Sequence, residues 1–247
     1  MAKDISLNTE NYVVMANNLI KSKSKLSLNE IKLLRLTIMQ VMATDNELMT
    51  YQIHIKELAK LIGLNDDAHL YRTVQIMARH LLQEVVCICS EETKDWEMFQ
   101  WCSSCRYRDG IITIKLHDDL KPYLIQLKKN YTQYMVADIL VLKSVYAIRI
   151  YELIREGFKG QKVYADNCAI VTLDVDTIRK ATNTEEKYSQ MGHFKVKVID
   201  IAVREINDKL GYHVTYEDVK SSRKIIGFKF KIESKNNIFG ELSHENH

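Results

Sequence analysis

The sequence is poor in turn-forming residues, with one proline, Pro122, and eight glycines among 247 residues. This scarcity excludes a collagen-like chain, a proline-rich linker protein and a glycine-rich disordered protein. It also argues against a large all-β barrel, because that many turns need more glycine and proline. No run of about 18 apolar residues occurs, so the sequence predicts no membrane-spanning helix. The polar N-terminal segment lacks the apolar core of a signal peptide.

Neither cysteine content nor net charge assigns the chain to a special class. Five cysteines are an odd number, which is more typical of free thiols in a reducing cytoplasm than of a disulfide framework. Lys and Arg outnumber Asp and Glu by 35 to 32, and this weak excess permits a nucleic-acid partner without requiring one. With 46% hydrophobic and 27% charged residues the chain is typical of a soluble globular protein, and its length favours two domains.

The first half of the chain has the element order of a winged helix. A helix is expected over residues 26–43, where apolar residues recur at helical spacing and Ser27 forms a capping box with Glu30. A strand, two helices and another strand are expected at 50–55, 56–63, 68–84 and 85–89. The last two strands, at 98–107 and 111–116, turn at Asp109-Gly110.

The same order returns in the second half, with helices and strands expected at 144–156, 169–173, 174–181, 192–209, 212–218 and 225–232. The apolar positions of the halves align, as Ile53 and Leu58 do with Leu173 and Ile178. The segment between the copies, 121–143, is apolar and helical in pattern rather than rich in Gly and Ser. We therefore expect an α+β protein of two tandem winged-helix domains, 1–124 and 125–247, with an ordered helical junction and a mobile tail from about residue 234.

The longer helix of the second domain, 192–209, has a polar stripe that favours DNA binding. In a winged helix this helix enters the major groove and the hairpin wing lies along the DNA backbone. A charged helix face is often simply solvated, but here the basic wing tip and the repeat favour DNA. The candidate side chains are Ser189, Gln190, His193, Lys197 and Arg204, with Asp200 on the same stripe, and Lys220, Ser221, Ser222, Arg223 and Lys224 at the wing tip.

The corresponding stripe of the first domain is nearly uncharged, and it includes Ile76, so this face is a poor phosphate binder. The further DNA-binding candidates are Arg72, Gln75 and Arg79 on a neighbouring stripe, Arg106 and Arg108 near that domain's wing, and Lys128 and Lys129 in a basic, aromatic cluster of the junction. We expect the second domain to bind DNA more strongly. The first would supply protein contacts, including a dimer interface, and secondary DNA contacts.

Enzyme motifs such as a phosphate-binding P-loop, a zinc-protease helix or a nucleophile elbow do not occur, so we expect no catalytic residue, no cofactor and no metal. Two patterns leave an alternative open. Asp174 and Asp176 resemble a magnesium pair, although acidic residues at a helix start are more often caps. Cys87-x-Cys89 and Cys102-x-x-Cys105 resemble zinc ligands, but Cys102 and Cys105 would point to opposite faces of one strand.

Several blocks together resemble the plasmid replication initiator proteins of the Rep_3 type, which bind repeated origin sequences called iterons. The most telling block is residues 116–154, which leads into a helix with Ser144, Tyr146, Arg149 and Tyr151. The blocks LDVDTIRKAT, FKVKVIDIAVREIN and IIGFKFKI also match the style of that family, and the resemblance covers roughly residues 10–233.

The resemblance implies two winged-helix domains, no enzymatic activity and a bacterial cytoplasmic location. It implies double-stranded DNA with direct repeats as the ligand and a monomer–dimer equilibrium in which dimers repress their own promoter. It also implies recruitment of a host replication initiator and helicase. Three alternatives stay open: a tandem winged-helix transcriptional regulator without origin activity, a nuclease or primase that uses Asp174 and Asp176, and a pure protein-interaction module.

Overall fold

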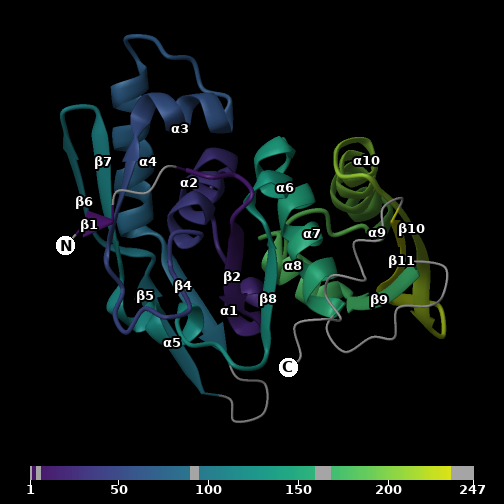
Figure 1. The fold of residues 1–247 in the computed structure, drawn as a ribbon. Coiled ribbons are helices and arrows are strands. Elements are labelled where there is room, and N and C mark those ends of the chain that lie inside the picture. Colours follow the sequence, from purple (N-terminus) through teal and green to yellow (C-terminus); the bar gives the residue numbers. More distant parts are fainter. Residues whose placement is uncertain (1, 4–6, 90–94, 159–167, 235–247) are drawn as a thin grey trace. The chain divides into compact units, whose positions relative to one another are not determined.

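The computed structural model describes residues 2–3, 7–89, 95–158 and 168–234, and it forms two compact units, Met1–Val141 and Leu142–His247 (Figure 1). The division falls after Val141 rather than after residue 124, so residues 125–141 pack with the first unit. The strand in this segment pairs with a strand near the N-terminus, which ties it there. The tail beyond residue 234 lies outside the described residues.

The first unit is a winged helix with additional strands. Its elements are β1 (Ala2–Lys3), β2 (Tyr12–Ala16), α1 (Asn17–Lys21), α2 (Leu28–Ile38), β3 (Thr50–His54), α3 (Ile55–Ile62), α4 (Leu70–Gln83), β4 (Val85–Cys89), β5 (Trp96–Gln100), β6 (Cys102–Arg108), β7 (Ile111–Leu116), η1 (Asp118–Leu120), α5 (Lys121–Leu124), β8 (Tyr131–Met135) and α6 (Val136–Val141). The main sheet has the order β1-β3-β7-β6, and β2–β8 and β4–β5 form two small sheets.

Local sequence signals set the ends of these elements. The capping box of α2 forms as expected, with the Ser27 amide donating to Glu30 Oε2 at 2.7 Å. The wing turns at Asp109-Gly110, where both residues have positive φ (50° and 80°), the combination that a two-residue type I′ hairpin requires. The predicted helix start and the predicted hairpin turn are therefore confirmed.

The predicted single strand at 98–107 is wrong, because the chain changes sheets at Trp101. Residues before Trp101 pair with β4, and residues after it pair with β7. The Trp101 side chain is buried at the switch, only 1% exposed, so it belongs to the core. Burial of this large ring explains the break better than any local turn signal, because the sequence has neither Gly nor Pro there.

The junction 121–143 is ordered but not wholly helical. It contains α5, β8 and α6, and β8 pairs antiparallel with β2, with Tyr134 opposite Val13. Side chains of β8 alternate between half-buried and buried, the period-2 pattern of a strand. Thr132 and Tyr134 favour such a position, and we infer that the partner strand, more than a hundred residues away, decides the local structure.

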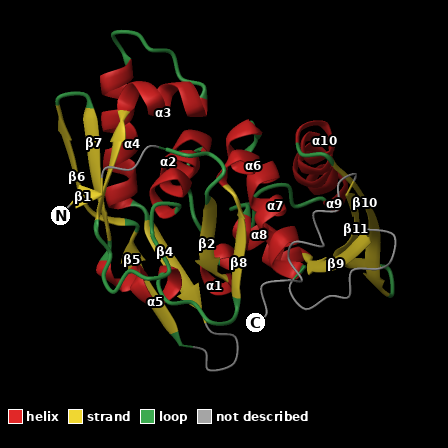
Figure 2. Ribbon diagram, in the orientation of Figure 1, coloured by secondary structure: helices red, strands yellow, loops and turns green. Residues whose placement is uncertain are grey.

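The second unit repeats the winged-helix order without the additional strands (Figure 2). Its elements are α7 (Val145–Gly157), β9 (Cys168–Asp174), α8 (Val175–Ala181), α9 (Met191–Phe194), a π-helical turn η2 (Lys195–Ile199), α10 (Asp200–Lys209), β10 (Tyr212–Ser221) and β11 (Lys224–Ser234). The sheet order β10-β11-β9 matches β6-β7-β3 of the first unit, so the predicted repeat is confirmed. No helix in the described part of the chain is long and apolar enough to cross a membrane.

The π-helical turn changes which residues of the predicted helix 192–209 face the core. Phe194, Val198, Ala202 and Ile206 are buried, as the helical spacing predicts. Ile199 is also fully buried, whereas Ile201, which was expected to face inward, is only half-buried. The wider turn contains one extra residue, so the residues after it are rotated around the helix axis. A projection that assumes about 100° per residue throughout does not include this rotation.

Gly227 lies where β11 passes closest to β9, and this approach generates a stability prediction. A Cβ at position 227 would sit 2.7 Å from the backbone oxygen of Leu173, so the two strands would have to part. We expect Gly227→Ala to lower the free energy of unfolding by about 1–3 kcal/mol, as measured in urea. The matched control is Gly192→Ala in α9, where a Cβ meets nothing within 4 Å; equal loss in both variants would contradict this account.

Candidate nucleic-acid interface

The candidate residues of the second unit gather on the solvent face of one helix and at one hairpin tip. His193, Lys197, Asp200 and Arg204 are all exposed on α9–α10, and Ser189 and Gln190 are exposed immediately before α9. The wing tip follows the same pattern, with Lys220, Ser221, Ser222, Arg223 and Lys224 all exposed where β10 turns into β11. The structure therefore gives this unit a helix and a wing that both carry available donors.

Two polar contacts fix the wing strand β10 against this helix. Lys195 Nζ lies 2.7 Å from Asp218 Oδ1, and the Tyr216 hydroxyl donates to Asp200 Oδ1 at 2.5 Å. Lys195 Nζ also lies 5.4 Å from the centre of the Tyr216 ring. Desolvation by burial, followed by the bond to Asp200, raises the pKa of Tyr216, so the phenol stays protonated and keeps donating. The roles of Lys195, Tyr216 and Asp218 could not be predicted from the sequence, because the pairing joins elements far apart along the chain.

Arg179 on α8 fixes the turn that leads into the helix. Its guanidinium donates to the backbone oxygens of Thr184 at 2.8 Å, Lys187 at 2.7 Å and Tyr188 at 2.9 Å. The same group lies 4.1 Å from the centre of the Phe194 ring, at the start of the helix. A planar group with five donors suits such a site. Arg179 therefore positions Ser189 and Gln190 without facing the solvent stripe itself.

The α7 residues that carry the family resemblance also support this turn and the end of α8. Arg149 is 3% exposed, pairs with the fully buried Glu152 at 2.5 Å and donates through Nε to the Ala181 backbone oxygen at 3.0 Å. The Tyr146 hydroxyl lies 3.4 Å from that of Tyr188. Ser144 caps the helix by accepting from the Tyr146 amide. These residues are parts of the scaffold rather than of the surface.

The first unit has an equivalent surface on α4 and the β6–β7 wing. Arg72, Gln75 and Arg79 are exposed, as are Arg106 and Arg108 on β6. Helical spacing places Ile76 on the same face as Arg72 and Arg79, and this side chain is 55% exposed. His80 does not join them, because its Nδ1 lies 2.8 Å from Glu30 Oε2 and anchors α4 to α2.

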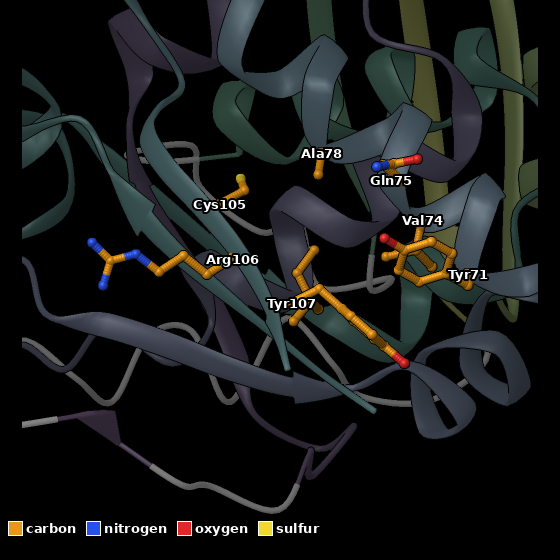
Figure 3. Close-up of a pocket in the computed structure, with 8 residues that line it drawn as sticks. Tyr71, Val74, Gln75, Ala78, Cys105, Arg106 and Tyr107 are labelled. Carbon is orange, nitrogen blue, oxygen red and sulfur yellow. The ribbon is translucent and has the colours of Figure 1, made fainter. Parts of the chain in front are cut away.

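A cavity of about 230 Å³ separates α4 from β6 (Figure 3). Tyr71, Gln75 and Ala78 line it from the helix, and Cys105 and Tyr107 line it from the strand. The rings of Tyr71 and Tyr107 meet edge to face, with centroids 4.8 Å apart, and Figure 3 shows the Arg106 side chain extending away from the other labelled side chains. The aromatic pair holds the wing beside the helix.

Lys128 and Lys129 are exposed, but they lie just before β8 and not at the wing. The strand that follows them belongs to the β2–β8 sheet, which is separate from the sheet of β6 and β7. Tyr134, part of the same sequence cluster, is fully buried. The structure therefore does not join this cluster to the surface of α4.

The magnesium alternative has little support in the described residues. Asp174 is the N-cap of α8: Oδ1 accepts from the Thr177 amide at 2.7 Å and Oδ2 accepts from the Thr177 hydroxyl at 2.6 Å. Its oxygens are thereby engaged in capping, as the sequence analysis favoured. Across the described ranges no group of three or more His, Cys, Asp and Glu is arranged to hold a metal ion.

The two cysteine pairs lie in different sheets, which argues against the zinc alternative. The reason expected from the sequence, that Cys102 and Cys105 point to opposite faces of one strand, is wrong. A β-bulge between Cys102 and Ser104 puts Cys102 and Cys105 on one face of β6, and a hydrogen bond from Cys102 lowers the pKa of Cys105. Cys87 and Cys89 also share a face, with sulfurs 3.7 Å apart, but they belong to the β4–β5 sheet. All five cysteines are free thiols.

Comparison with known proteins agrees with this architecture. The family model described as "Initiator Replication protein, WH1" matches residues 12–155, and "Initiator Rep protein, WH2" matches residues 174–232. This chain belongs to the family of initiator replication proteins. The resemblance predicted from the sequence is thereby confirmed, and so is the expectation of two winged-helix domains.

Individual relatives have low sequence identity but extensive coverage. The PI protein of Escherichia coli is 26% identical over 242 residues, which cover 92% of this chain and 77% of that protein. A crystal structure of Pi initiator protein in complex with iteron DNA is 18% identical with a TM-score of 0.75, covering 93% of this chain and 100% of the other. Domains 2 and 3 of RctB are 10% identical with a TM-score of 0.50, covering 87% and 86%. These structures share the fold of this initiator.

Arg179 generates a prediction about the turn of the second unit. We expect Arg179→Met to lower the free energy of unfolding by about 1–3 kcal/mol, because three backbone oxygens lose a charged donor. The variant should also weaken DNA binding, since Ser189 and Gln190 lose their support. Lys180→Met, the adjacent cation on the same helix, is the control. Urea unfolding and fluorescence anisotropy measure the two effects, and identical behaviour of the two variants would contradict the positioning role.

Proposed function

We propose that this protein initiates plasmid replication by binding directly repeated sites, or iterons, in double-stranded origin DNA. Each unit would place one helix in the major groove and one wing along the backbone. The supporting observation is that both units present the same pair of features: an exposed cationic helix face and an exposed cationic hairpin. The family membership and the iteron complex of the Pi structure support the same ligand.

The charge distribution suits a polyanion. Among the described residues no ion pair engages the cations of the two surfaces, namely Arg72, Arg79, Arg106, Arg108, Lys197, Arg204, Lys220, Arg223 and Lys224. Other cations, such as Lys121 with Glu47 at 2.6 Å, are paired within the protein. Available cations can release counterions from DNA, and this release drives sequence-independent affinity. Gln75, Gln190, Ser189 and His193 add donors that can reach base edges.

The two units would contribute unequally to DNA binding. The second unit would be the main DNA reader, because its helix and wing, with the two residues just before the helix, carry five available cations and five further polar donors. The first unit would add secondary DNA contacts and a dimer interface. Dimers would repress the protein's own promoter, and bound monomers would recruit a host replication initiator and helicase in the bacterial cytoplasm.

The mechanism that we propose is geometric and needs no catalytic group. Copies bound to an array of repeats strain the adjacent duplex, and the free energy of binding offsets the cost of opening it. A transcriptional regulator of the same fold would bind its site but leave the neighbouring duplex closed. Permanganate reactivity of thymines beside a repeat array separates the two: the initiator opens the duplex, and the regulator does not.

The wing tip generates a prediction about salt dependence. We expect the triple variant Lys220→Ala, Arg223→Ala, Lys224→Ala to weaken binding to any duplex of about 30 bp. The slope of log affinity against log salt should fall by up to about 2.7, since each phosphate contact contributes about 0.9. Titrations between low and moderate salt measure the slope.

Lys121→Ala is the matched control, because its ammonium is already paired with Glu47. It should leave the slope unchanged. A wild-type affinity that does not depend on salt would contradict DNA binding itself and would favour a protein-interaction module. A normal slope in the triple variant would contradict only the wing assignment.

A further inference from the structure

Each candidate recognition helix exposes one β-branched aliphatic side chain in the middle of its polar face. Ile76 on α4 is 55% exposed, and Val196 on η2 is 57% exposed. Both lie on the solvent side of helices whose opposite faces are buried, at Val74 and Met77 in one and at Val198 and Ile199 in the other. The two units thus share this feature although their polar residues differ.

The surroundings of these side chains argue against a simple extension of the core. Arg72 and Arg79 lie one turn before and one turn after Ile76, and Gln75 is adjacent to it. Val196 lies between the exposed His193, Lys197 and Asp200. An apolar protein partner would have to desolvate these charged and polar groups, which is costly. A DNA groove would instead pair them with phosphates and base edges while covering the aliphatic group.

We propose that Ile76 and Val196 read the C5-methyl groups of thymines in the major groove, and this inference rests on the proposed function. The thymine methyl is the apolar group that base pairs display in that groove, and apolar side chains are what contact it. Gln75, which rims the cavity of Figure 3, presents next to Ile76 the side-chain type that pairs with adenine. The two helices therefore favour A·T pairs at one position each within the site.

Replacement of thymidine by deoxyuridine tests this proposal, because deoxyuridine lacks only the methyl group and keeps the hydrogen-bonding pattern of thymine. The duplex is the one that the full-length protein binds best from a random pool, with each thymine replaced in turn. We expect wild-type affinity to fall about fourfold at the contacted thymines, the value of one buried methyl group. Ile76→Ala should abolish that sensitivity at one thymine of the site, and Val196→Ala at a different thymine.

The controls distinguish failure of this inference from failure of the proposed function. Alanine is a better helix former than either residue, so both variants should stay folded. Met42→Ala removes an equally exposed apolar side chain outside the helices and should keep every deoxyuridine effect. Absence of any DNA binding by the wild type would overturn the proposed function. Two outcomes would overturn only the proposed contacts with thymine methyl groups. One is specific binding with no deoxyuridine effect, and the other is a deoxyuridine effect that is unchanged in Ile76→Ala and Val196→Ala.

Discussion

The buried cation Arg149 is the constraint on which the second unit depends. Its guanidinium is paired with Glu152 inside the protein and donates to the last backbone oxygen of α8. A buried charge is costly unless it is paired and hydrogen-bonded, so this position tolerates little change. Because α8 carries Arg179, and Arg179 holds the turn before α9, the orientation of the helix that begins at α9 follows from the core. In the first unit Glu30 has the equivalent task, since it closes the capping box of α2 and also binds His80 on α4.

The polar residues of this initiator therefore fall into two groups with different tasks. Arg149, Arg179, Lys195 and Asp218 are engaged with the protein, and the Lys195–Asp218 pair ties the helix to the wing. The cations of the helix faces and wing tips are exposed and remain available to a ligand. A rigid support beneath the exposed cations is what pre-organised recognition needs, because less of the protein must be ordered on binding.

The features that depend on local signals could be predicted from the sequence. The capping box at Ser27, the type I′ turn at Asp109-Gly110, the cap at Asp174 and the repeated element order all have signatures within a few residues. Features that distant parts of the chain decide could not be predicted in this way. The switch of sheets at Trp101, the strand β8 and the bulge that puts Cys102 and Cys105 on one face depend on partner strands. The π-helical turn at Lys195–Ile199 shifts which residues face the core, so a uniform helical projection is wrong there. The role of Arg179 could not be predicted because its partners are backbone oxygens, which no residue type indicates.

The central claim is that two cationic helix-and-wing surfaces on one chain read repeated origin DNA. Its most direct test is selection of duplexes bound by the full-length protein from a random pool, followed by a search for the selected sequence near the gene. The account predicts enrichment of one defined site, long enough for two winged helices, that occurs there as an array of direct repeats. No enriched sequence, or an enriched site that occurs only once and is never repeated, would contradict it.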